Sequence, residues 1–291
     1  MLLKNKASLS ILSAMIIFGT IGIFRRYIPF PSSVIAFSRG VIGFAVLLVF
    51  LFVTKKGFSM EKIGKSFLLL CVSGALMGFN WILLFEAYNF TSVAAATLCY
   101  YMAPVFVIIA SPLLFGEKLG TRKLFCVIGA VIGMIFVSGA AERGFGGISE
   151  IKGIFLGLGA AVLYASVVVM NKKTAEVPSF EKTVVQLGSS AAVILPYILL
   201  TEDISSLELT AKTVLLLLIV GIVHTGIAYV LYFGSIGKLS AQKAAIFSYV
   251  DPVSAIIFSA VFLDEKLSVS GVAGAILILG CAFLIEKEKT K

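Results

Sequence analysis

Two ionisable residues lie within long apolar stretches of the chain, where a charge is costly. Asp251 stands immediately before Pro252, and His224 is the single histidine among the 291 residues. A charged side chain at the centre of a bilayer costs at least about 2.5–3.5 kcal/mol on insertion scales, so such a residue usually serves a function. Asp251 is therefore predicted to accept a substrate ammonium or a proton, with a structural hydrogen-bonding role as the alternative. His224 falls at a similar predicted depth and could be its neighbour or a neutral packing residue.

Aromatic residues occur inside the apolar stretches as well as at their ends. Trp81 follows Asn80 in the middle of one stretch, whereas an aromatic belt would place tryptophan and tyrosine at the membrane interfaces. Interior rings can hold an apolar or cationic group by stacking and cation–π contacts, and ordinary helix packing is the alternative for each ring. The predicted substrate-binding residues are Asn80, Trp81, Tyr100, Tyr101, Tyr164, His224, Tyr229, Ser248, Tyr249 and Asp251.

Pro104 and Pro252 lie near the middle of two predicted spans. Proline has no N–H group, so each residue removes the hydrogen bond to the carbonyl four positions earlier, at Tyr100 and Ser248. A freed carbonyl at membrane depth needs a partner, which water or a bound molecule can supply. Both prolines are therefore predicted to act as hinges beside a polar cavity, and a packed kink is the alternative.

Two further charged residues, Arg39 and Glu86, are predicted to lie near the same face of the membrane, at depths that differ by only a few ångströms. They could form an ion pair that acts as a gate, or each could extend separately to the interface. Glu117 and Glu265 follow the two proline-containing spans, each beside a lysine. A solvated cap or ion pair is the default for them, and a gate at opposite faces is the alternative.

Chemistry that depends on a metal or a nucleophile is not indicated. One histidine without a second histidine or a cysteine cluster cannot complete a tetrahedral metal site. The sequence has no phosphate-binding loop of the G-x-x-x-x-G-K-[ST] type and no motif that pairs a nucleophile with a base. We therefore expect no metal, no cofactor and no enzymatic activity. A membrane-embedded enzyme and a channel are the alternative classes.

The elements that must position these residues are membrane helices. Hydrophobic residues make up 59% of the chain and charged residues 13%, with a mean hydropathy of +1.08, which is too little polar surface for a soluble domain. Continuous apolar runs of the length that crosses a bilayer recur, whereas strands of a membrane β-barrel would alternate apolar and polar residues. The ten predicted spans are 8–24, 34–53, 67–88, 94–115, 124–139, 153–170, 183–200, 213–233, 242–263 and 269–285.

The net charge of +9 reflects membrane topology rather than a nucleic-acid surface. When the N-terminus is placed in the cytoplasm, most lysines and arginines fall in loops on the cytoplasmic side, as the positive-inside rule requires. An even number of spans then returns the C-terminus to the same side. The sequence predicts a multi-pass protein of the cell membrane, with lipid around it, both termini cytoplasmic and no nucleic-acid partner.

The chain contains an internal repeat. The segment YMAPVFVIIASPLLFGEKL at 101–119 resembles YVDPVSAIIFSAVFLDEKL at 249–267, so the fourth predicted span corresponds to the ninth. Five spans separate them, and because five is odd the two copies must cross the membrane in opposite directions. Residues 1–144 and 145–291 are therefore predicted to be two inverted five-helix halves, a plan found in secondary transporters with a substrate site where the repeats meet.

This doubled pattern, Pro-Val in mid-span followed by Gly-Glu-Lys-Leu or Asp-Glu-Lys-Leu, resembles the EamA family of the drug/metabolite transporter superfamily over essentially the whole chain. Arg39 matches an arginine common in the second helix, while Phe18 and Asp251 replace the usual tryptophan and glutamate. The resemblance implies a five-plus-five topology, alternating access and a central cavity. Most characterised relatives export amino acids and related metabolites.

The substrate class follows from the few charges inside the spans. A phosphorylated substrate would call for lysines or arginines at the midplane, and only Arg39 lies within a predicted span. Asp251 with nearby aromatic rings suits an amine or the ammonium of an amino acid, and a proton could compete for the same carboxylate. The leading hypothesis is a secondary transporter, with export as the expected direction. The oligomeric state is left open by the sequence.

Overall fold

The computed structural model describes residues 2–55, 57–115, 120–137, 147–236, 247, 250–265 and 268–288. Helices account for nearly all of these residues, and none of them forms a β-strand. The first half comprises α1 (Leu2–Arg26), α2 (Ser32–Val53), α3 (Met60–Phe90), α4 (Val93–Tyr100), α5 (Ala103–Phe115) and α6 (Thr121–Val137). The second half comprises α8 (Ile148–Lys173), α9 (Ser179–Thr201), η1 (Ile204–Ser206), α10 (Ala211–Leu218), η2 (Ile219–Ile227), α11 (Ala228–Ile236), α13 (Val250–Phe262) and α14 (Val269–Glu288).

Ten apolar helical segments can be distinguished by hydropathy and length among the described residues. Six are long and apolar enough to cross a membrane by themselves, and four shorter apolar helices accompany them in the described part of the chain. The all-α membrane fold predicted from the sequence is thus confirmed. The long segments are Lys6–Arg26, Ser32–Val53, Met60–Phe90, Ile148–Lys173, Ser179–Thr201 and Ala211–Ser235, and the shorter ones are Val93–Val107, Leu124–Val137, Val250–Phe262 and Val269–Cys281.

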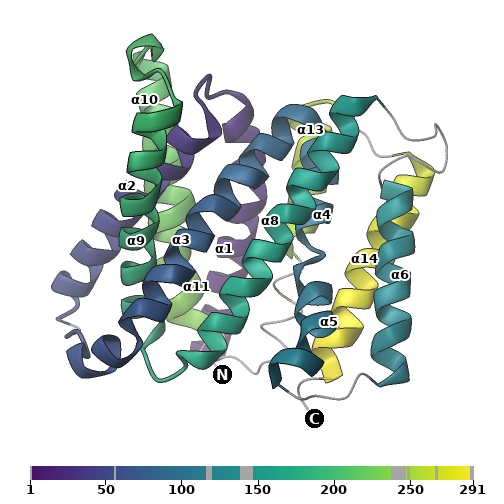
Figure 1. The fold of residues 1–291 in the computed structure, drawn as a ribbon, viewed down its shortest axis with the longest axis horizontal. Helices are drawn as coiled ribbons and strands as arrows, with labels where there is room; N and C mark the ends of the chain where they lie inside the picture. The colour runs from purple at the N-terminus through teal and green to yellow at the C-terminus, as the bar shows by residue number, and fades with distance from the viewer. Residues whose placement is uncertain are drawn as a thin grey trace.

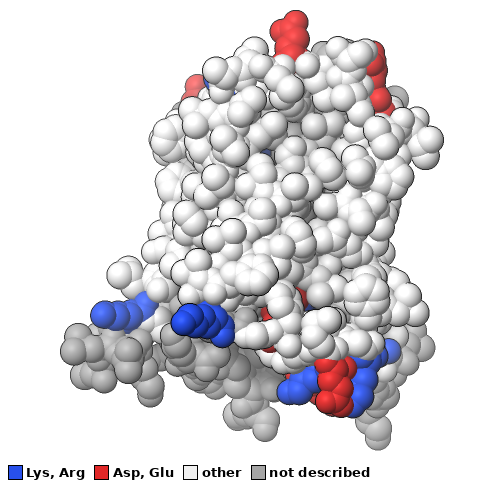
Figure 2. Space-filling view, turned by 90° about the vertical axis from the view of Figure 1, so that its left-hand side faces the viewer, with Lys and Arg blue, Asp and Glu red and all other residues white. Residues whose placement is uncertain are grey.

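The surface of the bundle has the charge distribution of a membrane protein. Figure 2 shows a broad uncharged band across the middle of one face, with charged side chains gathered at the two ends. Large apolar side chains are exposed along the helices, among them Phe52, Phe125 and Val269. Apolar side chains that face outward in this way are stable against lipid and would be unfavourable in water.

The helices pack in a definite order around α3. The α3 helix contacts α8 and α9, α2 contacts α9 and η2, and α1 contacts α13 and α11. The main buried cluster includes Leu47, Phe85, Leu187 and Ile194, contributed by α2, α3 and α9. Along one side of the bundle, α6 and α14 form a separate pair (on the right in Figure 1). The arrangement leaves α1, α2, η2, α4 and α13 to surround the ionisable residues.

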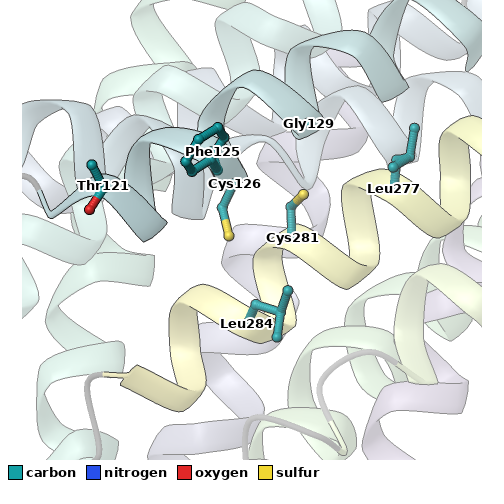
Figure 3. A pocket seen from close by; sticks show the side chains of 7 residues that line it. All are labelled: Thr121, Phe125, Cys126, Gly129, Leu277, Cys281 and Leu284. Carbon is teal, nitrogen blue, oxygen red and sulfur yellow. The ribbon is translucent and has the colours of Figure 1, made fainter.

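Contacts between α6 and α14 reflect the inverted repeat. A Cβ atom added to Gly133 would lie 2.7 Å from the carbonyl oxygen of Gly274, so the two backbones approach closely. The offset that aligns 101–119 with 249–267 carries Gly133 onto Cys281 and Gly274 onto Cys126, and the side chains of these two cysteines are close enough to interact. Both are labelled in Figure 3. The Gly133–Gly274 contact and the Cys126–Cys281 contact are therefore equivalent under the repeat, as a two-fold relation between antiparallel halves requires.

A groove opens between the same two helices, away from the predicted site. It has a volume of about 580 Å³ and is lined by Thr121, Phe125, Cys126, Gly129, Leu277, Cys281 and Leu284 (Figure 3). None of the residues predicted to bind substrate contributes to this lining. Its apolar character suits a surface that faces lipid.

Two predicted spans depart from a regular α-helix. The span predicted at 94–115 consists of α4 and α5, which are separated by a turn at Tyr101 and Met102. The span predicted at 213–233 contains the π-helix η2, where the side chains of His224 and Thr225 reach the carbonyls of Ile219 and Val220, five residues earlier. Single π-helical turns inside α-helices are frequent at functional sites.

Close contact between α3 and α9 depends on Gly74, and this leads to a stability prediction. A Cβ atom at Gly74 would lie 2.8 Å from the Cα of Gln186. This is a backbone atom, so the clash cannot be relieved by a change of side-chain rotamer. Gly74→Ala should lower the free energy of unfolding by about 1–3 kcal/mol because it overpacks this contact. Gly64 in the same helix has nothing within 4 Å of such a Cβ, so Gly64→Ala should be neutral or stabilising by up to about 1 kcal/mol.

Thermal unfolding in detergent measures both variants against the parent protein. Equal midpoints for Gly74→Ala and Gly64→Ala would contradict the close approach of α3 and α9.

Candidate functional site

Arg39 projects from α2 into the interior of the bundle. Its guanidinium carbon lies 4.0 Å from the centroid of the Trp81 ring and 5.7 Å from that of Phe85, both on α3. Its Nε donates a hydrogen bond of 3.0 Å to the hydroxyl of Thr225 in η2. The residue is only 6% exposed, and no carboxylate of the described residues lies within ion-pair distance of it. The direct contacts of this buried cation in the described part of the chain are thus with aromatic rings and a hydroxyl group.

Glu86 belongs to a different cluster, near the end of α3. Its carboxylate accepts hydrogen bonds from Ser32 at 2.7 Å and from Asn89 at 3.0 Å. Arg25 donates to the same two side chains, at 3.1 Å each. The predicted ion pair between Arg39 and Glu86 is therefore not formed. Similar depth did not bring the two side chains together, because Arg39 turns inward onto Trp81.

Asp251 is the second residue of α13, next to Pro252 in the first helical turn. Its carboxylate accepts a hydrogen bond of 2.7 Å from the hydroxyl of Tyr101, which follows the last residue of α4. The backbone of α13 lies close to α1 at this level, since a Cβ atom on Gly19 would be 2.7 Å from the carbonyl oxygen of Asp251. The carboxylate is thus placed where α1, α4 and α13 meet.

His224 is fully buried in η2 and contacts α1. Its Nε2 is 2.9 Å from the hydroxyl of Thr20, its Nδ1 is 3.4 Å from the carbonyl oxygen of Ile219, and its ring packs edge-on against Phe24 with centroids 4.8 Å apart. Both ring nitrogens therefore have neutral partners, and the contacts of His224 are not with Asp251. The predicted proximity of the two residues is not borne out by these contacts, because η2 directs the imidazole toward α1.

Four of the predicted tyrosines lie near the two charges, and Tyr164 is the most exposed of them, at the bundle surface. The ring of Tyr100 lies 5.2 Å from that of Tyr164 and 6.1 Å from that of Tyr101. Tyr229 packs edge-on against Phe18, with centroids 5.7 Å apart, and its hydroxyl interacts with Arg39. Ring contacts thus join Tyr100 to Tyr101 and Tyr164, while Trp81 and Tyr229 each lie beside Arg39.

Asn80 lies in the contact between α3 and α8. It is completely buried, and its amide nitrogen donates a hydrogen bond of 2.5 Å to the carbonyl oxygen of Ala160. Its carbonyl oxygen has no partner among the described residues. Substrate binding by Asn80 stays a prediction, while the observed contact joins two helices.

The two prolines occupy corresponding positions. Pro104 is the second residue of α5, in its first helical turn, where a missing N–H costs little, and Pro252 is the third described residue of α13. The chain turns at Tyr101 and Met102 just before Pro104, so this proline starts a new helix rather than bending a continuous one. Their hinge role stays a prediction. Ser248, Tyr249 and Glu117 lie outside the described residues.

Opposite charges are the main electrostatic feature of this interior. Asp251 and Arg39 are close enough to interact electrostatically, and Tyr100 is within reach of both. They come from different repeats, α13 and α2, and form no direct ion pair. Among the described residues no group of three histidine, cysteine or carboxylate side chains is placed to hold a metal ion. The arrangement can bind a small molecule that carries both an anionic and a cationic group.

Several contributors to this site were not predicted from the sequence. Thr20, Phe24, Phe85 and Thr225 are ordinary residues of apolar helices, and only their contacts with Arg39 and His224 distinguish them. Thr225 directly follows the lone histidine, and a polar pair inside an apolar span was the one available signal.

Comparison with known proteins assigns the family. The sequence profile of the EamA-like transporter family matches residues 5–139 and again 151–286. The chain is 27% identical over 292 residues to the uncharacterized transporter YxxF of Bacillus subtilis (strain 168), covering 99% of this chain and 92% of that protein. It is 28% identical over 252 residues to mouse (Mus musculus) solute carrier family 35 member G1, covering 83% and 67% respectively.

A solved crystal structure shares the fold, with a TM-score of 0.65 at 22% identity over 99% of both chains. The two profile matches lie one in each half of the chain, as the internal repeat predicts. They cover the helices that carry Arg39 and Asp251, so the site lies within the family's own domain rather than in an added segment. The chain belongs to the EamA-like transporter family and is a membrane transporter.

Proposed function

We propose that this protein is a secondary transporter of small zwitterionic metabolites, such as amino acids, with simple amines as weaker substrates. The observation that supports the proposal most is the pair of opposite charges inside the bundle, Arg39 on α2 and Asp251 on α13. Neither has an ion-pair partner among the described residues. A substrate carboxylate bound to the Arg39 guanidinium and a substrate ammonium bound to the Asp251 carboxylate would neutralise both protein charges at once.

Each end of such a substrate has suitable donors and acceptors. The guanidinium presents a planar fork that matches a carboxylate, and its stacking on Trp81 holds that plane in one orientation. Asp251 can exchange its bond from the Tyr101 hydroxyl for one from a substrate ammonium. The rings of Tyr100, Tyr164 and Tyr229 can enclose an apolar or aromatic side chain.

Protons are the proposed coupling ion. A proton and a substrate ammonium cannot both occupy the Asp251 carboxylate, so loading one displaces the other, and the two are exchanged across the membrane. The two halves, 1–144 and 145–291, would rock against each other around the shared site. The proposal includes export across the cell membrane, which the family resemblance supports, and cytoplasmic termini, which the positive-inside distribution of lysine and arginine supports.

The test is flux in proteoliposomes that contain the purified protein. Three compounds with one carbon skeleton are compared: an amino acid, the amine that lacks its carboxylate and the acid that lacks its ammonium. We expect saturable exchange for the amino acid, stimulated by a proton gradient, weaker exchange for the amine and none for the acid. Exchange of the acid as fast as that of the amino acid across a panel of side chains would refute the zwitterion site. Flux that does not saturate would indicate a channel.

A further inference from the structure

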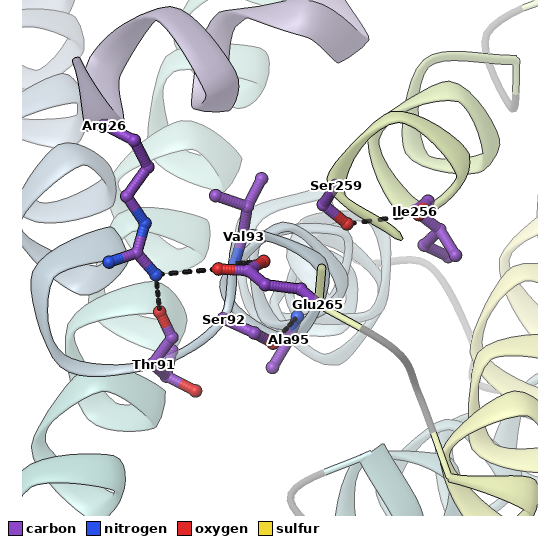
Figure 4. A network of polar contacts seen from close by, with 8 residues as sticks. All are labelled: Arg26, Thr91, Ser92, Val93, Ala95, Ile256, Ser259 and Glu265. Carbon is purple, nitrogen blue, oxygen red and sulfur yellow. Dashed lines mark hydrogen bonds and ion pairs between the residues drawn. The ribbon is translucent and has the colours of Figure 1, made fainter. Parts of the chain in front are cut away.

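Glu265, just beyond α13, joins three helices at one end of the bundle. Its Oε1 pairs with Arg26 at the end of α1 at 2.8 Å, and its Oε2 accepts a hydrogen bond of 2.6 Å from the backbone N–H of Val93 at the start of α4. Arg26 also donates to the carbonyl oxygen of Thr91 at 3.1 Å. Figure 4 shows Arg26 and the start of α4 converging on this one carboxylate.

The bond to Val93 completes the cap of α4. Ser92 is the N-cap and accepts a hydrogen bond from Ala95, and Glu265 supplies an acceptor for a further N–H of the first turn. A carboxylate at a helix N-terminus also interacts favourably with the helix dipole. Only 15% of the Glu265 side chain is exposed, compared with 83% for Glu61 in the surface pair Glu61–Lys65. The contact at Glu265 is therefore sheltered, unlike an ordinary surface ion pair.

The chain after α13 is shaped to present this carboxylate. Asp264 has a φ of 58°, in the left-handed region, and the N–H groups of Leu263 and Glu265 both donate to the carbonyl oxygen of Ser259. This backbone folds back over the end of α13. The position of Glu265 is thus fixed by its own helix as well as by its partners.

The same helix ties α4 at both ends. Asp251 is the second described residue of α13 and accepts a hydrogen bond from Tyr101, which follows the last residue of α4. Glu265 follows α13 and accepts a hydrogen bond from the N–H of Val93, the first residue of α4. Two glycines of α1 allow α13 and α4 to pack closely against it. A Cβ atom on Gly19 would lie 2.6 Å from Cβ of Ser254 on α13, and one on Gly22 would overlap the side chain of Val93 on α4. The helices α1, α4 and α13 therefore pack closely together between Asp251 and Glu265.

We propose that Glu265 is the latch that closes this face of the transport path and that the Arg26–Glu265–Val93 contacts must separate before the path opens there. This assignment goes beyond the proposed substrate. Loss of the Tyr101 bond at Asp251 would loosen one of the two hydrogen-bonded links described above between α4 and the α13 segment, and the latch is the other. Occupancy of the site and opening of the face are therefore coupled through α4 and α13. In the topology with cytoplasmic termini this is the outer face.

The test measures access to a buried position without any substrate. The four native cysteines are replaced, and Ser254→Cys, which is 8% exposed in the parent and faces Gly19 on α1, reports separation of α1 from α13. A membrane-impermeant thiol reagent is added to one side of proteoliposomes and then to the other. Single cysteines at Gly57 and Gly147, on opposite faces in the proposed topology, identify which side is which.

We expect slow labelling of Ser254→Cys in the parent protein and labelling about tenfold faster, from the Gly147 side only, when Glu265→Ala is added. Glu265→Gln keeps an acceptor for the Val93 N–H and removes the charge, so it should give an intermediate rate. Arg26→Ala should resemble Glu265→Gln, and the combination of the two should be no faster than either alone. Glu61→Gln, which removes a surface ion pair, should leave the rate unchanged.

Unchanged labelling in Glu265→Ala and in Arg26→Ala would overturn the latch, as would equal acceleration from both sides. If Glu265→Ala does not fold, Glu265→Gln and Arg26→Ala decide the question, since each keeps part of the contact. Because no substrate is present, the result is independent of the proposed zwitterion site.

Discussion

Asp251→Asn is expected to abolish proton-driven transport while the protein folds and inserts normally. Asparagine keeps the shape of the side chain and can still accept the bond from Tyr101, but it cannot carry a negative charge or release a proton. Loss of one partner of a buried charge interaction costs about 2–5 kcal/mol, which corresponds to at least about a 30-fold loss of affinity for the substrate ammonium. The measurement is flux in proteoliposomes with and without a pH gradient.

Tyr101→Phe is the matched control for this prediction. It removes the hydroxyl that donates to Asp251 but leaves the carboxylate in place, so coupled flux should persist, with a changed apparent affinity. A thermal midpoint within a few degrees of the parent would show that Asp251→Asn is folded. Parent-like flux with an unaltered response to the pH gradient in Asp251→Asn would refute proton–substrate exchange at this carboxylate. Asp251 would then be a structural hydrogen-bond acceptor.

Arg39→Gln is expected to weaken transport of amino acids about 100-fold and to leave transport of the matching amine nearly unchanged. The variant would lack the charged contact between the guanidinium and the substrate carboxylate, which lowers the binding free energy by about 2–3 kcal/mol. The variant should remain folded, because Arg39 has no described ion-pair partner that its removal would strand. The ratio of half-saturation concentrations for the two compounds measures the effect on the carboxylate separately from general loss of activity.

Arg39→Lys separates charge from geometry. Lysine retains the positive charge but lacks the planar fork and the delocalised stacking on Trp81, so we expect it to recover only part of the selectivity. An equal loss for amino acid and amine in both variants would mean that Arg39 supports the bundle rather than the substrate carboxylate. Greater loss for the amine would contradict the assignment of the two ends.

The membrane fold could be predicted from the sequence almost completely. The number of spans, the all-α architecture and the repeat follow from apolar length and from the similarity of 101–119 to 249–267, which are properties of local sequence. The bilayer makes such predictions reliable because a backbone in lipid must satisfy its hydrogen bonds within each helix. The breaks were harder: Pro104 marked an interruption, but the turn at Tyr101 and the π-helix at His224 depend on contacts with other helices.

The sequence by itself determined which residues are unusual, and it predicted the depth of each in the membrane. Asp251, His224, Arg39 and the interior tyrosines were identified because polar groups are costly in apolar spans. Depth says nothing about the direction in which a side chain leaves its helix or about which helix it meets. Only the tertiary structure decided that Arg39 stacks on Trp81 instead of pairing with Glu86, and that η2 turns His224 toward Thr20. Rotation and neighbours are set by packing between helices, and in this chain small residues such as Gly19, Gly22 and Gly74 decide which surfaces come close enough to touch.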